Sequence, residues 1–394
     1  MSAGDFETIR PKVLPVLGPK GDEDDVNAVA EVIRSGWWVN GPKVEELEKR
    51  FAELVGTKYA VAVISNTAGL DLVLKAYGIK DCDVISPTIS FATTVGVPMW
   101  NNCTSRLADV DPVNHNIDPE CVRKMLRPDT KAIICVNMAG IPAPIQEIRK
   151  FFNGLIIEDC AHSCYVPGSG LEGDVAIWSF QGVKSVPCGD GGMVTTNSYE
   201  LMAKLRSLSW FGIESTYRRD KESGRFEGKN NGAKEQEDLS KKAGYRWQYD
   251  ITELGYKAYM IDLTAALCLS QLKKMDQNLE RRRHIQHKYN TELKDVIQTP
   301  PFSHTVQYYC AKVPADKRDA LIKFLATKNI HTSVHFRPLH QFTFFKQFQQ
   351  GLEFPVADRE WQRLISLPVH LNMSDYDIDY VIYWVKKFFS ESRV

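Results

Sequence analysis

Two short apolar runs in the stretch Gly154–Asn197 constrain the fold of this chain more than any other feature. The runs Leu155–Ile157 and Val175–Trp178 are short enough to be buried strands, and a buried helix would need to be longer. The first run leads into Asp159, and the second is followed by Lys184. Ligands of open α/β sheets sit outside the carboxyl ends of the strands. We therefore expect Asp159 and Lys184 to face one crevice.

Short apolar runs and helical patterns alternate along the first part of the chain. Such alternation is typical of a mostly parallel sheet that is covered by helices on both faces. We expect further strands at Ala60–Ile64, Asp83–Ser86, Arg106–Ala108 and Ala132–Val136, and helices at Asp22–Ser35, Val44–Val55, Ala68–Tyr77 and Ala92–Met99.

A second, smaller α/β unit is expected after a long amphipathic pattern that starts at Ala265. A chain of 394 residues exceeds a typical single core, so two domains are expected. We predict a large domain over residues 1–264, with an extended N-terminal arm, and a small domain over 265–394 that includes the connecting helix. The elements predicted for the small domain are a strand Val306–Val313, a helix Asp316–Thr327, a strand His331–His335 and a closing helix Tyr376–Phe389.

The composition disfavours several classes of partner. Lys plus Arg equals Asp plus Glu at 49 each, whereas nucleic-acid-binding proteins usually carry a basic excess, so we expect no nucleic-acid partner. No apolar run approaches the roughly 18 residues of a membrane span, and the first residues lack the apolar core of a signal peptide, so we expect no membrane partner. The nine cysteines are scattered singly, which is typical of reduced thiols in the cytoplasm.

A carboxylate and a lysine in one crevice suit pyridoxal 5'-phosphate (PLP) as cofactor. The lysine forms a Schiff base with PLP, and the acid pairs with its pyridinium nitrogen. Lys184 precedes the glycine-rich turn Cys188–Gly192, whose backbone can approach a ligand closely. Simpler explanations exist, because most lysines are solvated surface groups and Asp159 could cap the next helix.

The junction Ser65–Gly69, between a strand and a helix, is a candidate phosphate site. Free N–H groups and the helix dipole attract anions there, and the Thr67 hydroxyl adds a donor. Simple helix capping by Ser65 or Thr67 explains the same residues. Ser179 offers a further hydroxyl, and Phe91 could stack on a pyridine ring, although a core position is commoner for phenylalanine.

The segment Tyr217–Ala243 is about as polar as a disordered linker. Its composition favours a surface loop, and its place within a domain also suits a lid or a substrate contact.

Other sites with recognisable motifs are not expected. His284 and His287, like the histidines near residue 335, lack the closed ligand set of a zinc site, so we expect no metal. The glycines after Lys184 lack the Lys-Ser/Thr of a nucleotide P-loop, and there is no Gly-x-Ser-x-Gly elbow.

Taken together and in this order, these motifs resemble the DegT/DnrJ/EryC1/StrS family of PLP-dependent sugar aminotransferases. The resemblance covers nearly the whole chain and is strongest in IIEDCAHS, SFQGVKSVPCGDGGMVTTN and GYKAYMIDLTAALCLSQL. It implies the α/β, type I aminotransferase fold: a large domain around a mostly parallel seven-stranded sheet, a small C-terminal α/β domain, and a homodimer with active sites at the interface.

The resemblance also implies roles for single residues. Lys184 resembles the Schiff-base lysine and Asp159 the partner of the pyridinium nitrogen. The other implied cofactor contacts are Thr67, Ala68 and Ser179, on the phosphate, and Phe91, on the ring face.

The chain departs from the family pattern at two positions. His162 stands where members often have a glutamine that contacts the 3'-oxygen of the cofactor, and we expect its charge to depend on pH. The family motif Gly-x-Asn-x-Arg is here Gly255-Tyr256-Lys257-Ala258-Tyr259, and Lys257 could still reach the phosphate as a point charge.

The function expected from this resemblance is transfer of an amino group from an amino acid, with L-glutamate as the expected donor, to a keto-sugar, expected to be nucleotide-linked, in glycan or secondary-metabolite synthesis. A dehydratase branch of the family replaces the lysine with histidine, so Lys184 disfavours a sugar dehydratase, whereas an aromatising synthase stays open. A non-catalytic sensor that retains the fold is a further alternative, which the Asp159–Lys184 pair disfavours.

Overall fold

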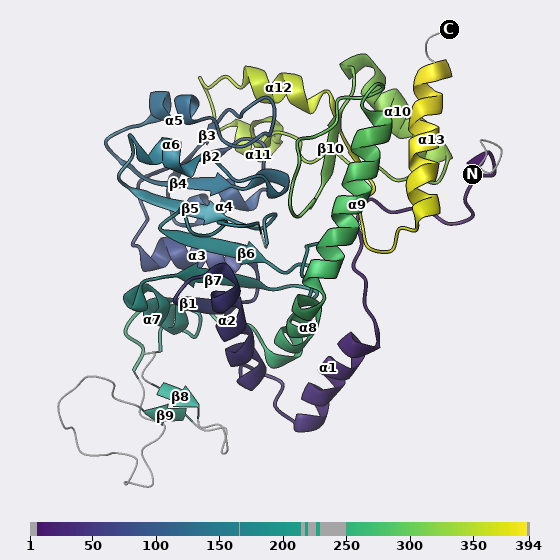
Figure 1. Cartoon of the computed structure of the whole chain (residues 1–394). Coiled ribbons are helices and arrows are strands. Elements are labelled where there is room, and N and C mark those ends of the chain that lie inside the picture. Colours follow the sequence, from purple (N-terminus) through teal and green to yellow (C-terminus); the bar gives the residue numbers. More distant parts are fainter. Residues whose placement is uncertain (1–5, 165, 214–216, 220–225, 229–249, 392–394) are drawn as a thin grey trace.

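The computed structural model describes residues 6–164, 166–213, 217–219, 226–228 and 250–391 (Figure 1). The polar segment Tyr217–Ala243 therefore lies outside the described residues, apart from two short antiparallel strands, β8 (Tyr217–Arg219) and β9 (Phe226–Gly228). No helix in the described parts of the chain is long and apolar enough to cross a bilayer.

A seven-stranded sheet forms the centre of the larger part of the molecule. Its strands lie in the order β1-β7-β6-β5-β4-β2-β3, and β7 alone runs antiparallel to its neighbours. The expected α/β architecture with a mostly parallel seven-stranded sheet is therefore confirmed. The strands are β1 (Tyr59–Val63), β2 (Asp83–Pro87), β3 (Thr104–Ala108), β4 (Thr130–Val136), β5 (Leu155–Asp159), β6 (Val175–Ser179) and β7 (Gly192–Thr196).

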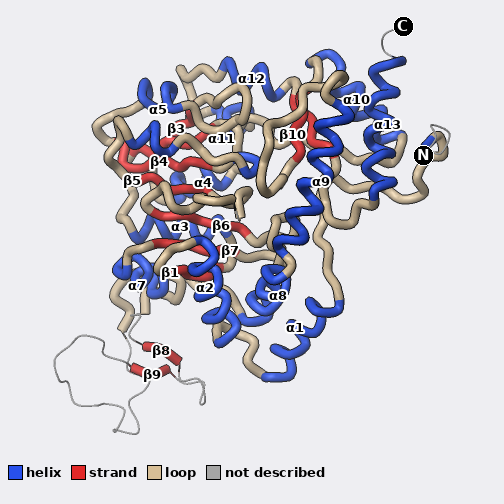
Figure 2. Tube along the Cα trace, viewed as in Figure 1, coloured by secondary structure: helices blue, strands red, loops and turns tan. Residues whose placement is uncertain are grey.

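Helices cover both faces of this sheet, because the strand side chains alternate between two apolar cores. In β6, Val175 and Ile177 pack into the core beneath α3 (Asn66–Ala76) and α7 (Tyr199–Leu208). Ala176 and Trp178 pack into the core beneath α2 (Pro42–Val55) and α8 (Asp262–Lys273). Figure 2 shows these helices around the strands. The helices of this part are α1 (Glu23–Ser35), α2 (Pro42–Val55), α3 (Asn66–Ala76), α4 (Thr93–Trp100), α5 (Pro119–Met125), α6 (Ile145–Arg149), α7 (Tyr199–Leu208) and the 3-10 turn η2 (Met138–Gly140).

The C-terminal part has its own core, and helix α9 links this part to the larger one (Figure 1). This separate core supports our proposal of a second domain, but Ala265, Cys268 and Leu279 pack into the core of the large sheet, and the C-terminal core begins only at Ile285. Phe6 and Leu14 of the N-terminal arm are buried in it, so the arm, which we grouped with the large domain, packs on the small one. The elements here are α8 (Asp262–Lys273), α9 (Met275–Leu293), β10 (Tyr309–Lys312), α10 (Ala315–Thr327), η4 (Leu339–Gln341), α11 (Thr343–Lys346), α12 (Pro355–Trp361), β11 (Leu364–Leu367) and α13 (Asp375–Glu391).

Three details differ from the sequence-based expectation. The predicted strand His331–His335 is wrong, because only Ser333 pairs with β11, as an isolated bridge to Ser366. The predicted strand Val306–Val313 is shorter, since β10 begins at Tyr309. Strand β7 was missed because its threonines interrupt the apolar pattern.

Candidate active site

Asp159 ends β5 and is buried at the carboxyl edge of the sheet. Its Oδ1 accepts hydrogen bonds from Asn66 Nδ2 at 3.1 Å and from the Ala161 N–H at 3.0 Å. Burial raises the pKa of this carboxyl, while the two hydrogen bonds and the nearby Lys184 oppose the rise. No helix begins at Ala161, so Asp159 does not serve as the helix cap considered above.

Lys184 lies in the loop after β6, the strand next to β5 in the sheet. Its side chain is only partly accessible, and the surrounding protein lowers the pKa of the amine from 10.5 to about 8, while the charge of Asp159 opposes that change. Its Nζ lies 5.8 Å from the centre of the Tyr308 ring. Adjacent strands thus bring a buried carboxylate and a desolvated amine close enough to interact.

His162 is buried in the loop that follows Asp159. Its Nδ1 has no hydrogen-bond partner among the described residues. Burial, together with the positive charge of Lys184 and the neighbouring His335, lowers its pKa well below 6.5. We expected the charge of His162 to depend on pH. Its lowered pKa moves that dependence to acidic pH, so the ring is neutral near pH 7, and one ring nitrogen has no partner among the described residues.

Helix α3 begins at the carboxyl end of β1, where the phosphate site was predicted. Ser65 caps the helix, because its Oγ accepts the Ala68 N–H at 3.1 Å. The capping explanation is therefore correct for Ser65, and the Ala68 amide is engaged within the helix. The Thr67 hydroxyl lies 2.9 Å from that of Thr93. An α-helix leaves its first amides without intrahelical partners, so this end remains suited to an anion.

Gly192 and Ser179 lie beside this helix end. The two residues pair across β6 and β7. A Cβ atom at Gly192 would lie 2.6 Å from the backbone nitrogen of Asn66, so only glycine lets β7 pass the start of α3. Ser179 is 8% exposed, and its Oγ accepts the Gln181 N–H at 3.4 Å.

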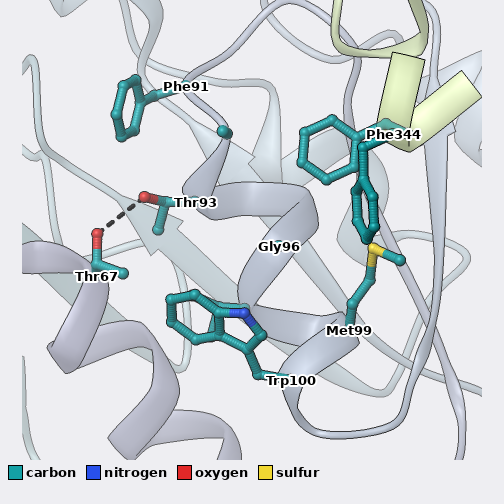
Figure 3. A pocket seen from close by; sticks show the side chains of 10 residues that line it. Thr67, Phe91, Thr93, Gly96, Met99, Trp100 and Phe344 are labelled. Carbon is teal, nitrogen blue, oxygen red and sulfur yellow. Dashed lines mark hydrogen bonds between the residues drawn. The ribbon is translucent and has the colours of Figure 1, made fainter. Parts of the chain in front are cut away.

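Phe91 is 63% exposed, so the core position considered above is wrong. It lines an open pocket of about 540 Å³ together with Thr67 and Thr93, whose hydrogen bond lies on the same side of the pocket as Phe91 (Figure 3). Trp100 and Phe344 also line this pocket. An aromatic face and a helix N-terminus therefore border the same open space.

Three aromatic residues of the C-terminal part close the crevice beside Lys184. Tyr308 stacks on His335 with ring centres 3.9 Å apart and meets His162 edge-on at 4.9 Å. Phe336 stacks on His162 with ring centres 6.1 Å apart. Sequence reasoning missed these residues, because they come from a distant part of the chain and carry no local motif.

Asn66 was also missed, although its position gave a usable signal. It lies between Ser65 and Thr67, the two residues that we considered for helix capping and phosphate binding. Its buried amide joins that junction to Asp159.

Lys257 is exposed. The Ile64 N–H donates to the carbonyl of Ala258, and Val63 pairs with Tyr259, so this segment runs antiparallel along the outer edge of β1. This register places Lys257 beyond the carboxyl end of β1, on the side of the sheet from which α3 starts.

Comparison with known proteins agrees with this geometry. The model of the DegT/DnrJ/EryC1/StrS aminotransferase family matches residues 19–386. The spore coat polysaccharide biosynthesis protein SpsC of Bacillus subtilis is 35% identical, with 94% of this chain and 95% of SpsC aligned.

Solved structures give the same result. The PMP-form of the putative sugar aminotransferase Spr1654 from Streptococcus pneumoniae has a TM-score of 0.85 at 25% identity, covering 96% of this chain and 99% of that one. DesI in the presence of its TDP-sugar product has a TM-score of 0.83 at 25% identity, covering 99% and 97%. The type I aminotransferase fold is thereby confirmed, and the neighbours indicate a sugar aminotransferase. The chain belongs to the DegT/DnrJ/EryC1/StrS family and is a PLP-dependent aminotransferase.

Proposed function

We propose that this protein transfers an amino group from L-glutamate to a keto-sugar linked to a nucleotide, in glycan or secondary-metabolite synthesis. The observation that carries the proposal is the desolvated amine of Lys184 beside the buried carboxyl of Asp159. The name of SpsC, which concerns polysaccharide synthesis, and the TDP-sugar product of DesI support a nucleotide-linked sugar. A cytoplasmic location is part of the proposal, supported by nine free cysteines.

The residues of the crevice fit PLP. Asp159 is a buried carboxylate with two hydrogen-bond donors, which leaves its second oxygen for a ring N–H. The unpartnered Nδ1 of His162 suits the 3'-oxygen. The first turn of α3, with Thr67 and Ser179 nearby, suits the phosphate, and the exposed ring of Phe91 suits the face of the pyridine.

When bound, PLP supplies an electron sink for the bonding electrons of the substrate carbon. Asp159 would hold the ring nitrogen in its protonated form. Lys184 Nζ would remove the α-proton of the amino donor and later deliver a proton to the sugar carbon, which an amine with a pKa near 8 can do in both directions. Tyr308 and Phe336 would exclude water from this amine.

A panel of nucleotide keto-sugars, each incubated with glutamate and read by mass spectrometry, tests the proposal. We expect one sugar to gain an amino group while glutamate becomes 2-oxoglutarate. Loss of water without amination would favour a dehydratase or an aromatising synthase instead. Tight binding of a sugar without any turnover would favour a sensor.

We also propose that the protein acts as a homodimer in which Lys257 reaches the phosphate bound by the neighbouring subunit. The exposure of Lys257 and of the nearby Leu254, which is 89% exposed, supports this arrangement. A monomer would then lack part of its phosphate site.

Mixing inactive Lys184→Ala protein with inactive Lys257→Glu protein tests the shared site. Hybrid dimers should contain one site free of both changes and recover up to about a quarter of normal activity if the subunits mix randomly. Native mass spectrometry would confirm subunit exchange. Exchange without any recovered activity would contradict a shared site.

A further inference from the structure

A short segment of the C-terminal part ties together three loops at the carboxyl edge of the sheet. The segment bends at Val306, whose φ is 46°, and three of its side chains each donate a hydrogen bond to a backbone carbonyl of the large domain. Ser303 Oγ donates to the Ala139 carbonyl at 2.8 Å, Thr305 Oγ1 to the His162 carbonyl at 2.7 Å, and Gln307 Nε2 to the Val183 carbonyl at 3.0 Å.

The three carbonyls follow three neighbouring strands, β4, β5 and β6. The segment 303–307 thus crosses the edge of the sheet at the crevice. Its hydrogen bonds go to the large domain, which explains why β10 begins only at Tyr309.

The bond made by Gln307 lies closest to Lys184. The Val183 carbonyl belongs to the same peptide unit as the Lys184 N–H, and that N–H donates to the Gln181 carbonyl at 2.8 Å. Both sides of this peptide unit are therefore held. Because the peptide is planar, two hydrogen bonds on opposite sides hold the plane that ends at the Lys184 Cα, and only rotation about the N–Cα bond is left to change the direction of the side chain.

Gln307 itself is fully buried, and its Oε1 has no partner among the described residues. A buried acceptor without a donor destabilises the folded state, so the hydrogen bond from Nε2 is made at a cost in stability. The next residue, Tyr308, packs its ring beside the lysine amine. Gln307 therefore restrains the backbone of Lys184, and Tyr308 packs beside its amine.

We propose that Gln307 is a positioning residue for the reaction: through the Val183 carbonyl, it fixes the peptide unit of Lys184 and so aims the amine into the crevice. This inference rests on the proposed role of Lys184.

The test compares Gln307→Met with Ser303→Ala in the full-length protein. Methionine has a similar length but no donor, so the Val183 carbonyl loses its partner. Ser303→Ala removes two hydrogen bonds of the same segment that are remote from Lys184, the one to the Ala139 carbonyl and the one from the Val306 N–H, so it is a demanding control for general damage to the segment. Gln307→Asn, one methylene too short to reach Val183, should behave as the methionine variant does and replaces it if that variant fails to fold.

Turnover is the first measurement. We expect Gln307→Met to lower kcat by about tenfold to a hundredfold with little change in KM, since a small misplacement of a reacting group has effects of this size. Ser303→Ala should retain most of its kcat. Equal losses of kcat in the two variants would overturn the proposal and leave domain docking as the role of the whole segment.

The second measurement does not need cofactor. In protein stripped of PLP, the pH dependence of Lys184 acylation, followed by peptide mass spectrometry, reports the pKa of its amine. The groups that face this amine are Asp159, His162, His335 and Tyr308, and burial holds its pKa near 8. An amine that is free to turn toward water loses part of this desolvation, so the midpoint should rise by about one pH unit in Gln307→Met.

An unchanged midpoint in Gln307→Met would overturn the proposal. The two hypotheses fail differently. A wild-type protein that never attaches PLP to Lys184 would contradict the proposed function, whereas the acylation midpoint would still report whether Gln307 orients the lysine.

Discussion

The two sides of the sheet at the end of β5 carry adjacent carboxylates in opposite situations. On one side, Glu158 accepts hydrogen bonds from Asn137 Nδ2 at 2.9 Å and from the N–H groups of Gly170, Glu172 and Gly173 at 2.8, 3.2 and 3.3 Å. On the other side, Asp159 has two donors and faces Lys184.

The difference separates a structural carboxylate from a reactive one. Both groups are buried, so burial alone does not distinguish them. Glu158 is satisfied by donors of its own chain and holds the loop 160–173 in place. Asp159 keeps an oxygen for a ligand, beside an amine of lowered pKa, which is the arrangement that functional sites use.

Removing the amine on the Asp159 side should have the largest effect. Lys184→Ala should lose essentially all turnover and still bind PLP noncovalently, because covalent attachment and proton transfer both use that amine. Borohydride reduction of the wild-type protein, followed by peptide mapping, should place the cofactor on Lys184. An adduct on another lysine would contradict the assignment.

Asp159→Asn should lower turnover by several orders of magnitude and leave the fold intact. Asparagine can still accept the hydrogen bonds of Asn66 and Ala161, but it cannot hold a ring nitrogen protonated. Steady-state kinetics and circular dichroism test the two halves of this expectation. Near-normal activity would mean that Asp159 only supports the loop after β5.

Glu158→Gln should act mainly on stability. The new NH₂ group would face the backbone N–H donors that now surround the carboxylate, which leaves buried polar groups unpaired and costs about 1–3 kcal/mol. Urea unfolding measures this cost, and kinetics normalised to folded protein measures turnover. A turnover loss as large as that of Asp159→Asn, without any loss of stability, would break the comparison.

The smallest expected effect is a shift in the pH dependence of Lys184. In cofactor-free protein, its acylation should have a midpoint near pH 8, since the amine is protonated and unreactive below its pKa of about 8. The negative charge of Asp159 raises that pKa, so Asp159→Asn should move the midpoint down. Glu158→Gln should leave it in place. Equal shifts in both variants would show that the two carboxylates act on the amine alike.

Much of the fold and part of the site followed from local sequence. The short apolar runs predicted most of the strands, because buried parallel strands are continuously apolar. Asp159 and Lys184 were predicted to share a crevice because both follow neighbouring strands, and the structure brings them into electrostatic contact. The prediction of a strand at His331–His335 was wrong because a local pattern does not show whether a neighbouring strand has a free edge to pair with.

The sequence by itself determined that Asp159 and Lys184 lie at the carboxyl edge of the sheet, because the positions of the short apolar strands follow from local composition. Only the tertiary structure decided how these groups behave. It shows that Glu158 is satisfied and Asp159 is not, that burial keeps His162 neutral, and that Gln307, more than a hundred residues from Val183, holds the peptide of Lys184. The physical reason is that desolvation and hydrogen bonding depend on atoms that come from distant parts of the chain, which no local pattern encodes.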